Sequence, residues 1–196
     1  MGTNRVEAFS DGVMAVAITI MVLELKAPEG IAAQDLWVLA PKFLTYVLSF
    51  LYVGIYWNNH HHLMAAAERV NGTVLWANLH LLFWLSLIPF TTAWMGTHPT
   101  AAWPMAAYGS VLMMAAVAWA VLQGAIIRLQ GDGSAVARAV GSDVKGKLSA
   151  GLYLAGVALA WWVPLASAAL YAGVALMWLV PDRRFEGVLG EEATKP

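Results

Sequence analysis

The stretch that decides the fold is NRVEAFSDG, residues 4–12, because it runs directly into the apolar segment VMAVAITIMVL of residues 13–23. Thr19 is the one polar residue of that segment. A helix rises about 1.5 Å per residue, so residues 9–25 would form about the shortest helix that spans a bilayer. Asp11 is therefore predicted to be an acidic residue at membrane depth.

This first helix has two different faces. A helix turns about 100° per residue, so Ser10 and Asp11 point to the flank and the back of the stripe that contains Phe9. A charge at membrane depth is costly, and Asp11 should therefore face protein or water. The stripe itself consists of Arg5, Phe9, Gly12, Val16, Thr19, Ile20 and Leu23.

The pattern R-x-x-x-F-S-D, formed by Arg5, Phe9, Ser10 and Asp11, resembles the signature of the transmembrane protein 175 family of bacterial and lysosomal potassium channels. The resemblance extends to Y-W-x-x-H-H at residues 56–61, N-L-x-L-L-F at 78–83 and L-S-L-I-P-F at 85–90. It implies an all-α membrane protein in which first helices from several subunits surround a central pore.

The composition independently indicates a polytopic membrane protein. Of 196 residues, 60% are hydrophobic and 12% are charged, which is far more apolar than a soluble domain. The net charge of −1 provides no basic surface for nucleic acid. The first apolar segment lacks a small-residue cleavage site, so we expect it to stay in the protein. The length suits the bacterial single-repeat members, and we expect a multi-pass protein of a bacterial cell membrane.

Six apolar windows predict six transmembrane helices in a single domain covering residues 1–196. The segment 131–147 is rich in Gly and Ser and is expected to be a cytoplasmic linker, and residues 185–196 a cytoplasmic tail. The predicted helices are about 5–26, 38–62, 73–96, 101–128, 145–163 and 165–181.

The distribution of positive charge predicts the orientation. If the N-terminus is cytoplasmic, all of the 11 Lys and Arg residues except Lys26 and Lys42 lie inside. Both termini are then cytoplasmic. The chain carries one copy of the signature, and since the two-repeat members of the family are dimers, the resemblance implies a homotetramer.

Polar side chains from three predicted helices fall at the same depth. A buried carboxylate is tolerable when donors satisfy it, and leaving it unpaired costs several kcal/mol. We therefore predict a network that anchors the first helix within its own subunit. Its members are Arg5, Ser10 and Asp11 with Trp57, His60 or His61, and Asn78. The spacing does not decide which histidine bonds Asp11.

The resemblance also implies where the pore narrows. It places Val16, Ile20 and Leu23 at an apolar constriction, with Thr19 as a ring of hydroxyls beside them. Periodicity alone is typical of an ordinary packing or lipid-facing stripe and does not indicate a pore. Narrow apolar rings gate by dewetting, and no T-V-G-Y-G-like segment is present to form a carbonyl filter. We expect a channel for monovalent cations that prefers potassium, with K+ as the permeant ion and no cofactor.

The sequence also has features that bear on three other functions. The run His60 to His62 could bind metal, but consecutive helical residues point about 100° apart, so no metal site is predicted. Asp11 beside histidines could relay protons, which leaves a proton channel or transporter as the alternative. A structural membrane subunit without flux is the third. Adjacent Ser10 and Asp11 do not form a nucleophile and base, and we expect no enzyme activity.

Overall fold

The first helix, α1 (Asn4–Leu23), begins with the signature and continues through the apolar segment without interruption. Its buried residues recur every three or four positions, as one face of a helix requires. They are Val6, Ser10, Met14, Ala17 and Met21. This face packs against α3 (Ala40–Ala66), α4 (Gly72–Ser86) and α5 (Ile88–Thr97). One side of α1 is therefore seated in the subunit.

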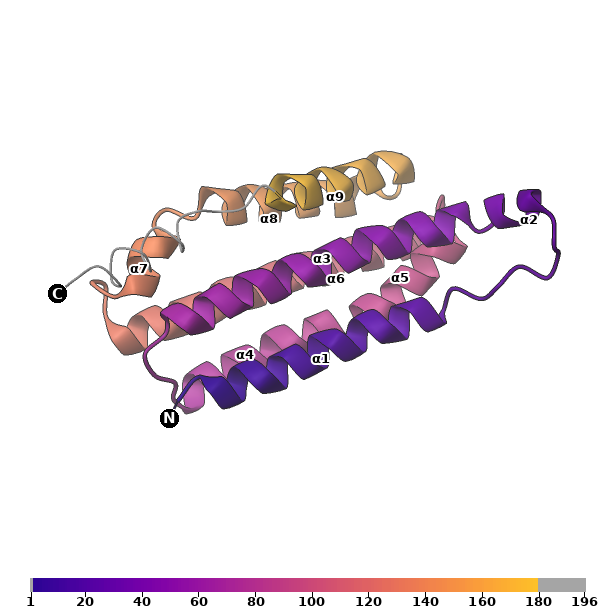
Figure 1. Cartoon of the computed structure of the whole chain (residues 1–196). Helices are drawn as coiled ribbons and strands as arrows, with labels where there is room; N and C mark the ends of the chain where they lie inside the picture. The colour runs from indigo at the N-terminus through magenta and orange to yellow at the C-terminus, as the bar shows by residue number, and fades with distance from the viewer. Residues whose placement is uncertain (1, 180–196) are drawn as a thin grey trace.

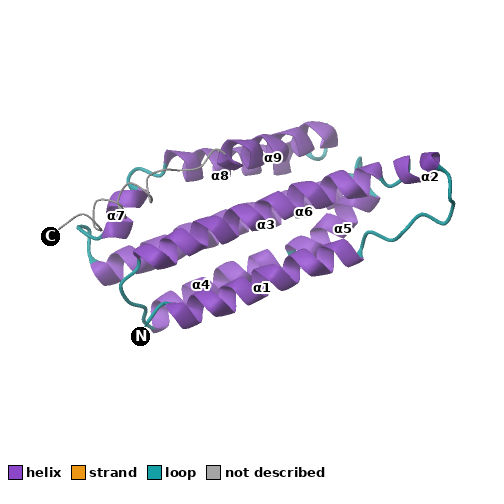
Figure 2. Cartoon of the chain, in the orientation of Figure 1, coloured by secondary structure: helices purple, strands orange, loops and turns teal. Residues whose placement is uncertain are grey.

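The computed structural model describes residues 2–179, which form an elongated bundle of helices (Figure 1). Loops join the helices, and the longest of them connects α1 to α2 (Figure 2). The remaining elements are α2 (Ala33–Trp37), α3 (Ala40–Ala66), α4 (Gly72–Ser86), α5 (Ile88–Thr97), α6 (Ala102–Gln130), α7 (Ala135–Val140), α8 (Val144–Leu159) and α9 (Pro164–Leu179).

Three helical stretches among the described residues are long and apolar enough to cross a membrane. They are Asn4–Leu23, Gly72–Thr97 and Ala102–Gln130, and Pro164–Leu179 is a shorter apolar helix. The boundaries of the long helices agree with the predicted ones to within about four residues, apart from the division of the third helix. The predicted tail, 185–196, and the end of the last predicted helix lie outside the described residues.

Two connections contain short helices that the sequence did not indicate. In the first loop, α2 is held by the Asp35 carboxylate, which accepts a hydrogen bond from the Ala32 amide at 3.0 Å. In the segment expected to be a linker, α7 buries Ala135, Val136 and Ala139. Apolar side chains at these three positions explain why this segment packs on the bundle and is not an extended linker.

The third predicted helix is divided at Leu87, between α4 and α5. Pro89 lacks an amide hydrogen and cannot donate to the Leu85 carbonyl four residues earlier. That carbonyl instead accepts from the Leu87 amide. The Ser86 hydroxyl donates to the Phe83 carbonyl at 2.7 Å, so it does not compensate for the proline. The third predicted span therefore consists of two helices that are separated by a break at Leu87.

Buried tyrosines occupy part of the space between α3, α6, α8 and α9. The Tyr52 hydroxyl donates to the Tyr171 carbonyl at 2.6 Å, and Ser49 and Tyr108 share a hydrogen bond of 3.0 Å. The ring of Tyr171 lies directly against Gly109 of α6 and Gly156 of α8, where an added Cβ would overlap it. The two glycines therefore make room for one buried aromatic ring.

Candidate functional site

The face of α1 opposite its buried side is apolar and open in the single chain. Four large side chains on it are about half exposed or more: Phe9 56%, Val16 55%, Ile20 46% and Leu23 75%. We call these four residues the apolar stripe. Thr19 is exposed beside it, and its hydroxyl donates to the Val16 carbonyl at 2.9 Å. The predicted constriction residues thus lie on one uncovered surface.

A groove of about 470 Å³ follows this surface, between α1 and the break in α4–α5. Phe9, Val16 and Ile20 line one side of it, and Ser86 and Pro89 line the other. Gly12 lies in the groove wall and has open space where a side chain would be. Apolar surface of this extent on one helix face marks an interaction site or a membrane contact.

The seated side of α1 is tied to two other helices by a chain of buried hydrogen bonds. Asn78 of α4 donates through Nδ2 to the Ser10 hydroxyl at 2.9 Å, and Ser10 donates to the Val6 carbonyl at 2.8 Å. His60 of α3 lies 2.8 Å from Asn78 Oδ1. Because an amide oxygen only accepts, His60 Nε2 carries the proton. We call Ser10, Asn78 and His60 the anchor.

The structure places the other predicted network members outside the anchor. Asp11 is half-buried, and its Oδ1 has no hydrogen-bond partner within residues 2–179. Arg5 is exposed, and its side chain makes no hydrogen bond to the described part of the chain. Trp57 is 47% exposed and stacks on His61. Asp11 lies outside the anchor because it is about 100° around the helix from Ser10, so the two side chains point in different directions.

His61 has a different partner from the one predicted. Its Nδ1 lies 2.7 Å from Glu7 Oε1 and the His61 side chain is 54% exposed. Sequence reasoning missed Glu7, although it stands in the first turn of α1 at the depth of the histidines. Among the described residues no group of three His, Asp or Glu could hold a metal ion.

Comparison with known proteins identifies the family. The family described as "Endosomal/lysosomal potassium channel TMEM175" matches residues 5–89. Over 97% of its length the chain is 51% identical to a potassium channel from Chryseobacterium sp. (strain P1-3), which it covers completely. The chain belongs to the TMEM175 family. It is therefore a membrane protein of an ion-channel family, and the resemblance seen in the signature is confirmed.

Two further comparisons place this TMEM175 protein among its relatives. The crystal structure of a lysosomal potassium-selective TMEM175 homologue from Chamaesiphon minutus matches with a TM-score of 0.77 and 28% identity, covering 92% of this chain and 97% of that one. The human endosomal/lysosomal proton channel TMEM175 is 26% identical over 102 residues, which is 50% of this chain and 20% of the human protein. The match to the Chamaesiphon minutus structure extends over nearly the whole described bundle.

Proposed function

We propose that this TMEM175 protein is a potassium-preferring cation channel of a bacterial cell membrane, assembled as a homotetramer with α1 around the pore. The observation that carries the proposal is the division of α1 into two faces. The anchor seats one face, with Ser10 fully buried, while the apolar stripe is uncovered in the single chain. The bacterial relative with 51% identity is named a potassium channel.

In this assembly the constriction consists of Val16, Ile20 and Leu23 from each copy. Water is unfavourable in a narrow apolar passage, so the closed pore excludes a hydrated ion, and opening requires the four helices to spread or rotate. Thr19 lies within one turn of these residues. The Thr19 hydroxyl donates its hydrogen to the Val16 carbonyl, so the lone pairs of the hydroxyl oxygen can face a cation. Without a carbonyl filter, the preference for potassium over sodium is modest.

The proposed topology has six spans, with the N-terminus of α1 in the cytoplasm. The proposed spans are α1, α3, the pair α4 and α5 as one, α6, α8 and α9. The excess of Lys and Arg at the proposed inner side supports this orientation. The anchor then lies near the inner surface, and the constriction lies further toward the outside.

A flux assay on purified protein in liposomes tests the channel directly. With potassium, sodium and caesium gradients imposed in turn, we expect potassium to pass faster than sodium. Size-exclusion chromatography with light scattering should give the mass of four chains. A folded tetramer without flux for any of the three ions would indicate a structural subunit, and a dimer or monomer would contradict the pore arrangement.

The second candidate is proton conduction. Two buried atoms, Asp11 Oδ1 and His60 Nδ1, have no hydrogen-bond partner within the described residues, and both can bind a proton. The vertebrate relatives are named proton channels. Current that persists when protons are the sole permeant cation, and that is lost in Asp11→Asn, would favour this function over potassium conduction.

A further inference from the structure

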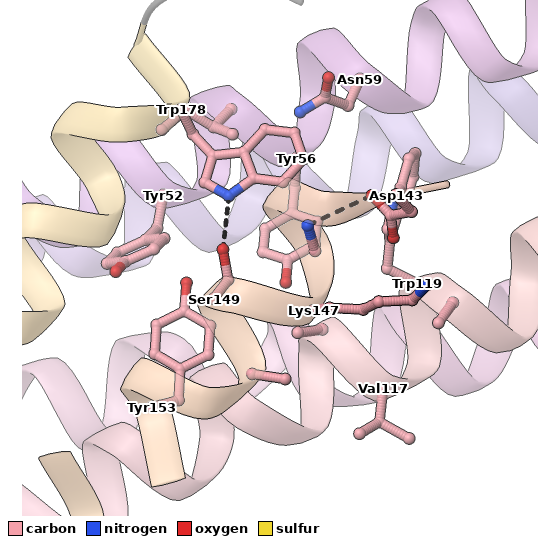
Figure 3. Close-up of a pocket in the computed structure, with 15 residues that line it drawn as sticks. Tyr52, Tyr56, Asn59, Val117, Trp119, Asp143, Lys147, Ser149, Tyr153 and Trp178 are labelled. Carbon is pink, nitrogen blue, oxygen red and sulfur yellow. Dashed lines mark hydrogen bonds between the residues drawn. The ribbon is translucent and has the colours of Figure 1, made fainter. Parts of the chain in front are cut away.

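A second cavity, of about 240 Å³, lies away from the pore helix. It is lined by residues of α3, α6, α8 and α9 and by Asp143 just before α8, and no residue of α1 lines it. Tyr56 and Tyr153 contribute to its walls, Trp119 and Trp178 flank it, and Lys147 lies at one end (Figure 3). An apolar cavity of about 150 Å³ is large enough to bind benzene, so this one can take a larger apolar group.

Hydrogen bonds hold the walls of this cavity in place. The Trp178 indole donates to the Ser149 hydroxyl at 2.8 Å, and Ser149 donates to the Lys145 carbonyl at 2.8 Å. Tyr52 is fixed by its hydrogen bond to the Tyr171 carbonyl. Side chains held in this way cannot readily collapse to fill the space. The cavity is thus pre-formed, which lowers the cost of binding a ligand.

The rim of the cavity is charged at the start of α8. Lys147 Nζ donates to the Ser142 carbonyl at 2.8 Å, which uses one of the three donors of an ammonium group. Lys145 Nζ lies 5.6 Å from the centre of the Trp178 ring. The nearby carboxylate of Asp143 accepts from the Gly146 amide at 3.2 Å and so caps the helix. Lys147 therefore stands at the edge of an apolar interior, and Asp143, the carboxylate among the described lining residues, is engaged in the helix cap.

We propose that this cavity binds an acyl chain of an anionic phospholipid, with the phosphate of the lipid at Lys147. The depth of the site follows from the proposed orientation, which places the start of α8 at the cytoplasmic surface. Basic pockets between transmembrane helices on that side bind anionic head groups, and a lysine near the surface contributes about 1 kcal/mol. Val117, 42% exposed at the cavity wall, gives the chain a path from the bilayer.

Native mass spectrometry of the purified full-length protein, titrated with phosphatidylglycerol or phosphatidylcholine in detergent, tests this site. Lys147→Gln removes the charge and retains a donor for the Ser142 carbonyl. We expect it to weaken phosphatidylglycerol binding about fivefold, the factor that corresponds to about 1 kcal/mol. Ala150→Leu fills the cavity from α8 and should abolish retention of the bound lipid. Lys26→Gln in the first loop and Ala155→Leu on the exposed side of α8 are matched controls and should bind as wild type does.

Three results would overturn the proposal: equal retention of the two lipids by the wild type, undiminished binding in Ala150→Leu, or the same loss in the controls as in the cavity variants. Potassium flux measured on the same preparation separates this inference from the channel assignment. Flux without lipid preference would remove only the lipid site, and lipid preference without flux would remove only the channel.

Discussion

The Asn78 amide donates to the Ser10 hydroxyl at 2.9 Å, with both side chains buried, and so joins α4 to the seated face of α1. The same amide accepts from His60, which connects α3. A single side chain thus fixes the rotation of α1 relative to two neighbours. If that rotation changed, the apolar stripe would no longer point in one direction.

Asn78→Leu should lower stability by about 1 to 2 kcal/mol, because the buried His60 donor loses its acceptor while the volume is nearly unchanged. Thermal unfolding in detergent measures the change. Asn58→Leu, at an exposed position of α3, is the matched control and should change the midpoint little. Equal midpoints for the two variants would show that the anchor does not stabilise α1.

Ile20→Asn and Leu23→Asn should raise the basal current, because amide side chains hydrate the constriction. Val22→Asn is the control, since Val22 is also exposed but lies off the stripe. Single-channel or liposome recordings compare the three variants. Basal current that rises only in Val22→Asn, or in none of them, would count against a pore lined by this face.

Gly109→Ala and Gly151→Ala should shift stability in opposite directions. At Gly109 a Cβ would overlap Tyr171, and overpacking of this kind costs roughly 1 to 3 kcal/mol. At Gly151 no atom lies within 4 Å, so alanine should stabilise α8 by roughly 0.5 to 1 kcal/mol. Thermal unfolding of both variants in the same detergent checks the sign. A neutral Gly109→Ala would mean that Tyr171 can move aside.

Glu7→Gln should change the unfolding free energy by less than about 1 kcal/mol, although Glu7 and His61 are only 2.7 Å apart. The His61 side chain is half exposed, and water solvates the separated groups nearly as well. The measurement is thermal unfolding at neutral pH beside Asn78→Leu. A loss as large as that of Asn78→Leu would assign Glu7 and His61 to the anchor.

Most of the helices can be predicted from hydrophobic patterning, because long apolar windows bounded by Gly, Pro and charged residues are typical of membrane helices. The anchor was partly predictable for the same reason, since depth alone brings Ser10, His60 and Asn78 together. The depth of a residue in the membrane does not determine the direction in which its side chain points around the helix. For this reason the sequence predicts Asp11 in the network, whereas its side chain points away from the anchor. For the same reason the sequence does not indicate that Glu7 is the partner of His61.

The cavity between α3, α6, α8 and α9 could not be foreseen from the sequence. Its existence depends on how far apart large side chains hold the helices, and Tyr52, Tyr153 and Trp178 look like ordinary core residues in the chain. The sequence likewise does not show that α7 is a helix that packs on the bundle. Gly and Ser around it indicate a loop, and its three buried positions are significant only once the bundle is known.

The seated face of α1 contains two methionines, Met14 and Met21, outward of Ser10. A thioether side chain is unbranched and adapts to a shifted neighbour, whereas the hydroxyl of Ser10 has one fixed geometry. Near its N-terminal end α1 is therefore held by a hydrogen bond of fixed geometry, and further along it packs through adaptable side chains. When the proposed pore opens, we expect the C-terminal half of α1 to move while its N-terminal end stays in place.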